Sequence, residues 1–201
     1  MKKRRFVTSL LALAVLAGLF SGCAEKEADV QEADPVAATY GETQIRQSLV
    51  DYEKQNLQAM NGNQTVTDRE AVEQLLLHLA MLDEAEQLGL SVTQEEVDAA
   101  FAVQKQNYEN NDEVRQYIDD WCEQTGVTID DYFRAVQEQL SRVMLRQKLR
   151  DALGEAYCKE HGLTFTKVNP PAEMESYVQD YLDGLLQKYS SKITYSSSLS
   201  K

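Results

Sequence analysis

Apolar and polar residues alternate along most of the chain with the period of an α-helix. In residues 112–125, for example, Val114, Tyr117, Ile118 and Trp121 recur at i, i+3, i+4 and i+7 and therefore share one helix face. The same pattern predicts six helices: residues 43–60, 67–88, 93 to at least 108, 112–125, 130–160, and a last one that follows Pro171 and runs through Leu186. The hydrophobic pattern thus predicts an all-α fold.

Local signals place the ends of several of these helices. Thr67 with Glu70, and Thr93 with Glu96, form two capping boxes, in which side chains satisfy free N–H groups of the first turn. Glycine followed by an apolar residue is typical of a helix end, and it occurs three times, at Gly89, Gly126 and Gly162. Gly154 lies within residues 130–160 and is expected to interrupt or kink that helix.

Two short segments outside the helices are candidates for extended structure, residues 36–40 and 193–195. If they pair, the two ends of the folded part of the chain lie side by side. We therefore expect one multi-helix domain over residues 36–195, with a short two-strand pairing of its ends. Residues 196–201 are polar for the most part and are expected to form a disordered tail.

The first 23 residues have the organisation of a secretory signal. A positive cluster at residues 2–5 is followed by 15 almost wholly apolar residues, 6–20, and by small residues before Cys23. A membrane-spanning helix needs about 20 apolar residues, so a cleaved signal is the better interpretation.

The residues before Cys23 (Phe20-Ser21-Gly22) resemble the bacterial lipobox. This resemblance implies cleavage before Cys23 and lipidation of that residue, and the alternative is ordinary secretion with Cys23 left as a thiol. Two or more acyl chains hold a protein firmly on a membrane. The prediction is a lipoprotein signal peptide at 1–22, a lipidated flexible tether at 23–35, and a domain anchored on the extracytoplasmic side of the cell membrane.

The chain is acidic, with 33 Asp and Glu against 20 Lys and Arg and a net charge of −13. Cleavage after residue 22 removes four basic residues and no acidic one, which leaves 16 against 33 and a net charge of −17. Such a charge repels nucleic-acid phosphates and anionic lipid headgroups. We therefore expect no nucleic-acid partner, whereas basic or apolar polypeptides remain candidates.

No pattern in the sequence predicts a reaction centre. The chain contains no G-x-S-x-G, H-E-x-x-H, P-loop or G-x-G-x-x-G motif, and its acidic pairs match no EF-hand spacing. His78 lies in an apolar helix and is interpreted as a packed side chain, while His161, just before a helix-ending glycine, is interpreted as a helix cap. We therefore expect no enzyme activity, no catalytic or metal-binding residue and no cofactor.

Cys122 and Cys158 are the cysteines that follow Cys23. Export would place them in a compartment where disulfides persist, so a Cys122–Cys158 bond is one alternative. Two separate buried thiols are the other, because the sequence does not show whether the two side chains approach each other.

Residues 75–101 (LLLHLAMLDEAEQLGLSVTQEEVDAAF) resemble the helix-turn-helix of the SurA and PrsA chaperone-foldases. The likeness rests on the E-A-x-x-L-G-L segment at residues 84–90 and on the E-E-V-D helix start at residues 95–98. Residues 126–149 are similar to the family's next element, a glycine-apolar-threonine turn and a long helix, and residues 177–195 look like its closing helix and final strand.

The resemblance implies a SurA N-terminal-like domain with a holdase-like role, the binding of unfolded exported polypeptides. Many relatives carry a parvulin prolyl-isomerase domain before the closing helix, but here residues 164–172 leave no room for one. Phe101, Trp121, Tyr177 and Tyr181 are the candidates for exposed binding residues, with core packing as the alternative. A structural or adaptor lipoprotein that binds one folded envelope partner is the competing function.

Overall fold

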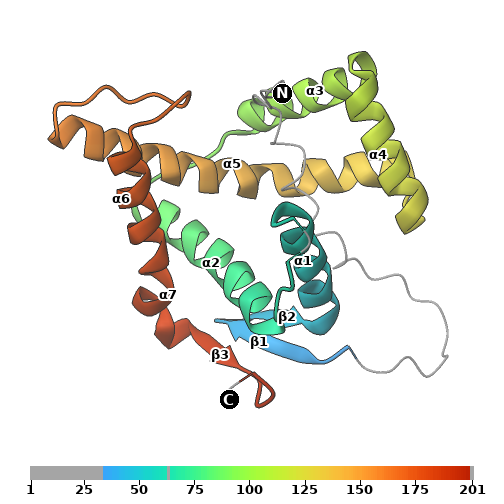
Figure 1. Cartoon of the computed structure of the whole chain (residues 1–201), viewed down its shortest axis with the longest axis horizontal. Coiled ribbons are helices and arrows are strands. Elements are labelled where there is room, and N and C mark those ends of the chain that lie inside the picture. Colours follow the sequence, from blue (N-terminus) through green and yellow to red (C-terminus); the bar gives the residue numbers. More distant parts are fainter. Residues whose placement is uncertain (1–33, 63, 200–201) are drawn as a thin grey trace. The chain divides into compact units, whose positions relative to one another are not determined.

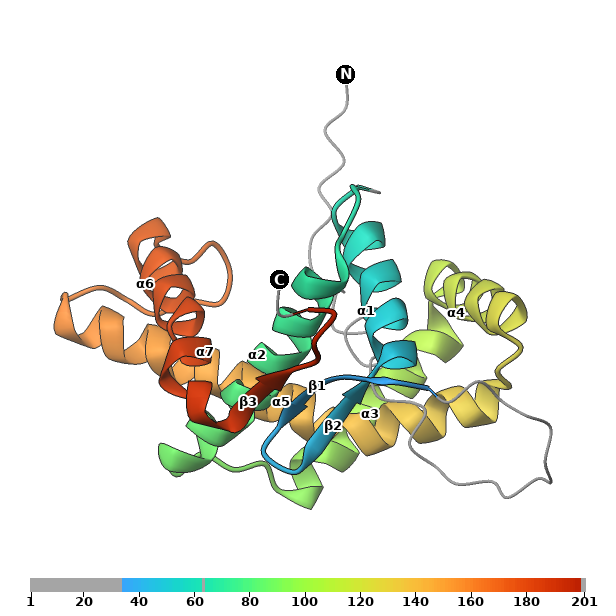
Figure 2. The same cartoon turned by 90° about the horizontal axis from the view of Figure 1, so that it is seen from below.

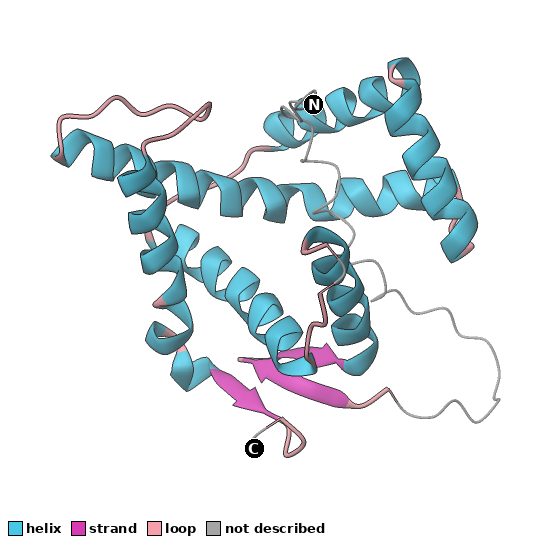
Figure 3. Ribbon diagram, in the orientation of Figure 1, coloured by secondary structure: helices cyan, strands magenta, loops and turns pink. Residues whose placement is uncertain are grey.

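The structure is a computed structural model that describes residues 34–62 and 64–199. It places most of the described chain in helices, with one small sheet (Figures 1 and 3). This confirms the mainly α-helical class for the described residues. The predicted signal peptide 1–22, Cys23 and all but the last two residues of the predicted tether lie outside them.

The described residues divide into two compact units. The insert unit is residues 92–144, and the core unit is residues 34–91 together with 145–199. The insert unit holds α3 (Gln94–Asn110), α4 (Asp112–Thr125) and the first half of α5 (Ile129–Glu160). The core unit holds the second half of α5 and these elements: β1 (Val36–Tyr40), β2 (Thr43–Arg46), α1 (Gln47–Met60), α2 (Asp68–Gln87), α6 (Ala172–Asp183), α7 (Leu185–Lys188) and β3 (Ile193–Tyr195).

The sheet of the core unit has three antiparallel strands in the order β2-β1-β3 (Figure 2). The predicted pairing of residues 36–40 with 193–195 is confirmed, with Ala38 opposite Tyr195 and Tyr40 opposite Ile193. The ends of the folded chain therefore meet in neighbouring strands.

The helix predicted from residue 43 begins later than expected, because residues 43–46 form strand β2. Gly41 has φ +56°, a conformation that suits glycine, and its turn folds β2 back along β1. Pairing with β1 then supplies hydrogen bonds along one side of these four residues, since β2 is an edge strand of the sheet. Ile45 keeps its predicted burial, although it reaches the core from a strand.

Helix α2 supplies the centre of the apolar core. Val72, Leu76 and Ala80 recur every four residues along its inward face and are fully buried. Side chains from the strands, from α5 and from the closing helices pack in the same cluster, among them Ile45, Leu149, Leu182 and Leu185. Burying a side chain of this size stabilises a fold by about 1.5–3 kcal/mol, so this cluster holds the core unit together.

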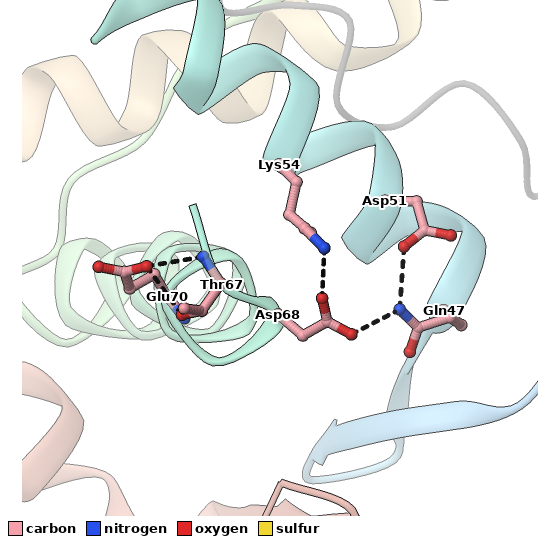
Figure 4. A network of polar contacts seen from close by, with 6 residues as sticks. All are labelled: Gln47, Asp51, Lys54, Thr67, Asp68 and Glu70. Carbon is pink, nitrogen blue, oxygen red and sulfur yellow. Dashed lines mark hydrogen bonds and ion pairs between the residues drawn. The ribbon is translucent and has the colours of Figure 1, made fainter. Parts of the chain in front are cut away.

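Polar contacts tie α1 to the start of α2 (Figure 4). Lys54 Nζ lies 2.5 Å from Asp68 Oδ1, and Gln47 Nε2 donates to Asp68 Oδ2 at 3.1 Å. The neighbouring capping box is confirmed, since the Thr67 backbone N–H donates to Glu70 and the Glu70 N–H donates to the Thr67 hydroxyl. The carboxylates of Asp68 and Glu70 also lie where the helix dipole favours negative charge.

Gly154 does not interrupt α5, contrary to expectation, because the helix is continuous from Ile129 to Glu160. A Cβ at this buried position would lie 2.9 Å from Met174 Sδ and 3.0 Å from Phe165 Cε2. Close packing of α6 and the α5–α6 loop against this face therefore explains the glycine.

Residues 196–199 of the predicted tail make contacts with the rest of the core unit. The Ser196 N–H donates to the Ala37 carbonyl at 2.9 Å, and Arg69 Nη1 donates to the Leu199 carbonyl at 3.0 Å. Leu199 also packs against the apolar cluster. These contacts add a short turn to the side of β1.

Helices α3 and α4 of the insert unit bury few of their described side chains, and the first half of α5 supplies the remaining buried ones: Tyr132, Ala135, Val136 and Leu140. Among the described side chains, Val97 is the buried residue of α3, and Ile118 and Cys122 are those of α4. The second capping box is confirmed where α3 begins, at residues 93–96. None of the described helices of the chain is long and apolar enough to cross a membrane.

Candidate functional site

Two acidic side chains near the end of α2, Asp83 and Glu84, organise polar contacts of the core unit. Glu84 is 1% exposed. Its carboxylate accepts hydrogen bonds from the Tyr181 hydroxyl at 2.5 Å, from Lys188 Nζ at 2.5 Å and from the Tyr189 hydroxyl at 2.8 Å. A buried carboxylate is tolerated when it is paired and hydrogen-bonded in this way.

Asp83 repeats the arrangement one residue earlier in the chain. Its Oδ2 accepts from the Tyr40 hydroxyl at 2.6 Å and from Lys192 Nζ at 2.5 Å. The two acidic residues and their partners, which we call the carboxylate network, therefore connect α2 to β1, to α6 and to the segment that follows α6.

The pKa values in the network favour the ionised carboxylates. Burial raises the pKa of Glu84, but the hydrogen bonds from Lys188, Tyr181 and Tyr189 outweigh it and bring the pKa below its ordinary value. Burial and the bond to Glu84 raise the pKa of Tyr181 to about 12, so its hydroxyl remains a donor at neutral pH. Tyr189 is raised in pKa for the same reasons.

These features indicate a structural role for the carboxylate network, which holds distant parts of the chain together. Glu84 is almost completely buried, and the hydrogen bonds to its carboxylate come from residues 97 to 105 positions away in sequence. The sequence offered a signal for it, because Glu84 continues the four-residue spacing of Val72, Leu76 and Ala80 on the buried face of α2. A charged residue at such a position predicts a buried partner.

An aromatic surface runs along the end of α5 and α6 in the core unit. The ring of His161 stacks on Tyr157 at 4.0 Å between centroids, and Tyr157 lies 5.0 Å from Tyr177. Tyr177 lies 6.5 Å from Tyr181. Tyr177 is 39% exposed, whereas Tyr181 is half-buried through its bond to Glu84.

The insert unit carries a second aromatic group. Phe133 of α5 makes edge-to-face contacts with Phe101 at 6.1 Å and Tyr108 at 5.3 Å, both from α3. It also contacts Tyr132, which lies 5.9 Å from Trp121 of α4. The rings of this group are half-buried except for that of Tyr132, which is buried. Edge-to-face contacts hold aromatic side chains in place without covering them completely.

The four aromatic candidates from the sequence therefore belong to two surfaces, one in each unit. Phe101 and Trp121 are in the insert unit, and Tyr177 and Tyr181 are in the core unit. Sequence reasoning missed Tyr117 of α4, which is 49% exposed. Its place in the apolar stripe of α4 predicted burial, because periodicity does not tell the edge of a stripe from its centre.

The histidines and cysteines are placed as follows. His78 is hydrogen-bonded to Gln74, and burial, with the charge of Arg146, lowers the pKa of His78 to about 3. His161 Nδ1 lies 2.9 Å from the Tyr157 carbonyl oxygen at the end of α5, as a capping residue does. Cys122 and Cys158 are both buried free thiols.

Among the described residues, no group of three or more His, Cys, Asp or Glu side chains is arranged to hold a metal ion. Comparisons with protein-family models, with curated proteins and with solved structures found no match. The geometry defines the class as follows: a mainly α-helical protein of two units, whose folded ends are joined by a small sheet and a buried carboxylate network, and whose two units each present aromatic side chains.

Proposed function

We propose that this protein is a membrane-anchored, extracytoplasmic holdase-like lipoprotein that binds unfolded exported polypeptides and has no catalytic prolyl-isomerase domain. The resemblance of residues 75–101 and 126–149 to the SurA and PrsA chaperone-foldases supports this role. The lipobox-like segment before Cys23 supports the anchor.

The observation that carries the proposal is the exposure of aromatic side chains on helices of both units. Tyr117 and Tyr177 are 49% and 39% exposed, and Phe101, Trp121 and Phe133 are half-buried. Removing apolar surface of this kind from water is favourable, so a partner that covers it is bound. An unfolded chain exposes apolar side chains along its whole length and can cover such surfaces without a specific fold.

The connection between α5 and α6 supports the absence of a catalytic domain. Only residues 161–171 lie between the end of α5 and the start of α6. A loop of this length cannot contain a folded domain, since domains have about 50 residues or more.

The test measures how well residues 24–201, the chain without its leader and its lipidated cysteine, suppress aggregation of several chemically unfolded proteins; this segment keeps both units whole. Light scattering follows the aggregation, and we expect it to be suppressed at near-stoichiometric ratios of protein to client. Replacing Tyr117 and Tyr177 together by serine should weaken suppression several-fold. The matched control replaces two other exposed apolar side chains, Met60 and Leu88, by serine and should leave suppression unchanged.

No suppression with any client would refute the proposal. Capture of one folded partner in a pull-down, together with indifference to unfolded chains, would establish the competing adaptor function.

The anchor has its own test. Mass spectrometry of the protein from membranes should find a chain that begins at an acylated Cys23. Cys23→Ala should release the protein from the membrane fraction, and an unmodified Cys23 on an intact leader would refute the predicted location.

A further inference from the structure

Helices α4 and α6 carry the same surface pattern, 60 residues apart. In α4 the pattern is Glu113, Tyr117, Asp120 and Trp121, and in α6 it is Glu173, Tyr177, Asp180 and Tyr181. In both helices an exposed tyrosine therefore has a glutamate four residues before it, an aspartate three residues after it and an aromatic residue four residues after it. We call these stretches the acid–tyrosine segments, residues 113–121 and 173–181.

The burial of the two segments matches as well. The residue after each tyrosine is buried, Ile118 in α4 and Val178 in α6, and each helix buries a second residue four positions later, Cys122 or Leu182. These buried positions turn the opposite face outward. The tyrosine and its two acidic neighbours are consequently exposed in each unit.

On a helix, side chains three and four residues apart are neighbours. Each exposed tyrosine ring is therefore flanked by one carboxylate on the preceding turn and one on the following turn. In the described part of the chain, none of these four flanking carboxylates takes part in an ion pair. An aromatic ring between two free negative charges suits a cation with an apolar stem, because the ring face attracts the charge and packs against the methylenes.

The protein itself shows which side chains such an arrangement holds. On the surface of α2, Arg69 lies between a carboxylate and a tyrosine, with Nε 2.5 Å from Glu73 Oε1 and its guanidinium carbon 3.9 Å from the Tyr195 ring centre. In the carboxylate network, Lys192 Nζ lies 2.5 Å from Asp83 and 5.7 Å from the Tyr40 ring centre. Both cationic residue types therefore occupy a carboxylate–tyrosine pair within this chain.

We infer that the two acid–tyrosine segments bind lysine and arginine side chains of extended polypeptides, so that the preferred clients are segments in which basic and apolar residues alternate. The inference rests on the proposed function and names its client class. The charge of the insert unit is complementary to such clients, since residues 92–144 contain 12 Asp and Glu against four Lys and Arg. Charge complementarity of this kind selects partners and speeds their encounter.

The experiment compares three fluorescein-labelled peptides of equal length and equal leucine content, whose polar positions are all lysine, all serine or all glutamate. Binding to residues 24–201 is measured by fluorescence anisotropy at low ionic strength and at about 0.15 M salt, where the Debye length is about 8 Å. We expect the order lysine, serine, glutamate, with the preference for lysine reduced by salt.

The site variant converts the four flanking carboxylates to amides: Glu113→Gln, Asp120→Asn, Glu173→Gln and Asp180→Asn. The control variant makes the same change in charge at four exposed glutamates outside both segments: Glu86, Glu109, Glu138 and Glu155. The site variant should bind the lysine peptide about tenfold more weakly, since each exposed contact between charges is weak but four are lost. The control variant should lose at most about twofold in affinity for the lysine peptide. Both variants should bind the serine peptide like the unaltered chain.

Equal binding of the three peptides would overturn the inference and leave the proposed function in place. Equal losses in the site and control variants would also overturn it, because the general acidity of the protein would then account for the preference. If none of the peptides binds and no client is protected from aggregation, the proposed function itself fails.

Discussion

Replacing Glu84 tests whether the carboxylate network holds the core unit together. Glu84→Gln keeps the size and shape of the side chain but removes its charge. The Tyr181 hydroxyl can turn and accept from the new amide, so the geometry survives. The bonds from Lys188 and Tyr189 then lose the assistance of the negative charge.

The size of the loss follows from these contacts. A hydrogen bond to a charged group contributes about 1.5–3 kcal/mol and is roughly twice as strong as a neutral one. Two bonds that each lose about half of this contribution should lower the free energy of unfolding by about 2 kcal/mol. Glu84→Ala removes all three bonds and leaves the Tyr181 and Tyr189 hydroxyls without this acceptor, so it should cost more than the amide variant, about 3–4 kcal/mol.

Urea unfolding, monitored by far-UV circular dichroism, measures the loss of unfolding free energy in Glu84→Gln and in Glu84→Ala. The same transition slope is used for all variants. The sole tryptophan, Trp121, belongs to the insert unit, so its fluorescence follows that unit separately. The matched control is Glu86→Gln, the same chemical change at an exposed position of the same helix, which should change stability by less than about 0.5 kcal/mol.

The pH dependence gives a second check on the same variant. The pKa of Glu84 is lower in the folded protein than its ordinary value of 4.5, so its contribution is complete above that pH and is lost as the pH falls through the folded pKa. The difference in free energy of unfolding between the unaltered protein and Glu84→Gln should therefore become smaller below about pH 4.5. Equal stability of Glu84→Gln and Glu86→Gln at pH 7, or a gap that widens in acid, would refute the reasoning.

Three further changes probe other parts of the structure. Burial lowers the pKa of His78 to about 3, so the unfolded chain takes up a proton between pH 7 and pH 5 and the free energy of unfolding should fall by about 2 kcal/mol over that range. Urea unfolding at the two pH values should show this loss in the unaltered protein and not in His78→Gln. An identical loss in the variant would contradict the assignment. Gly154→Leu should cost about 2–3 kcal/mol, seen as a lower urea midpoint, because Met174 already fills the space beside the glycine, and an unchanged midpoint would show that this face is open. Thr93→Ala removes the cap of α3 and should lower the free energy of unfolding by about 1 kcal/mol. Thr93→Ser keeps the capping hydroxyl and should therefore keep most of this stabilisation.

The helix ends and the meeting of the chain ends were accessible from sequence because their causes are local or strongly patterned. A capping box joins residues three apart, and both predicted boxes are present in the structure. The predicted strands at residues 36–40 and 193–195 stand out because each is a short apolar segment outside the helical periodicity, and they do pair. The six predicted helices are all present, with α1 shorter at its start and α7 following α6 after a break at Gly184.

Tertiary contacts decided the features that bear on function. Residues 43–46 have a pattern that fits a helix or a strand, and only pairing with β1 fixed them as a strand. The partners of Glu84 lie about a hundred positions along the chain, so no local rule could assign them. The exposure of Tyr117 and Tyr177 likewise depends on how far the neighbouring helices cover each stripe. Sequence thus determined most of the elements and the buried centres of their apolar faces, while long-range packing determined which apolar side chains remain in contact with water, because burial depends on every element that packs against a residue.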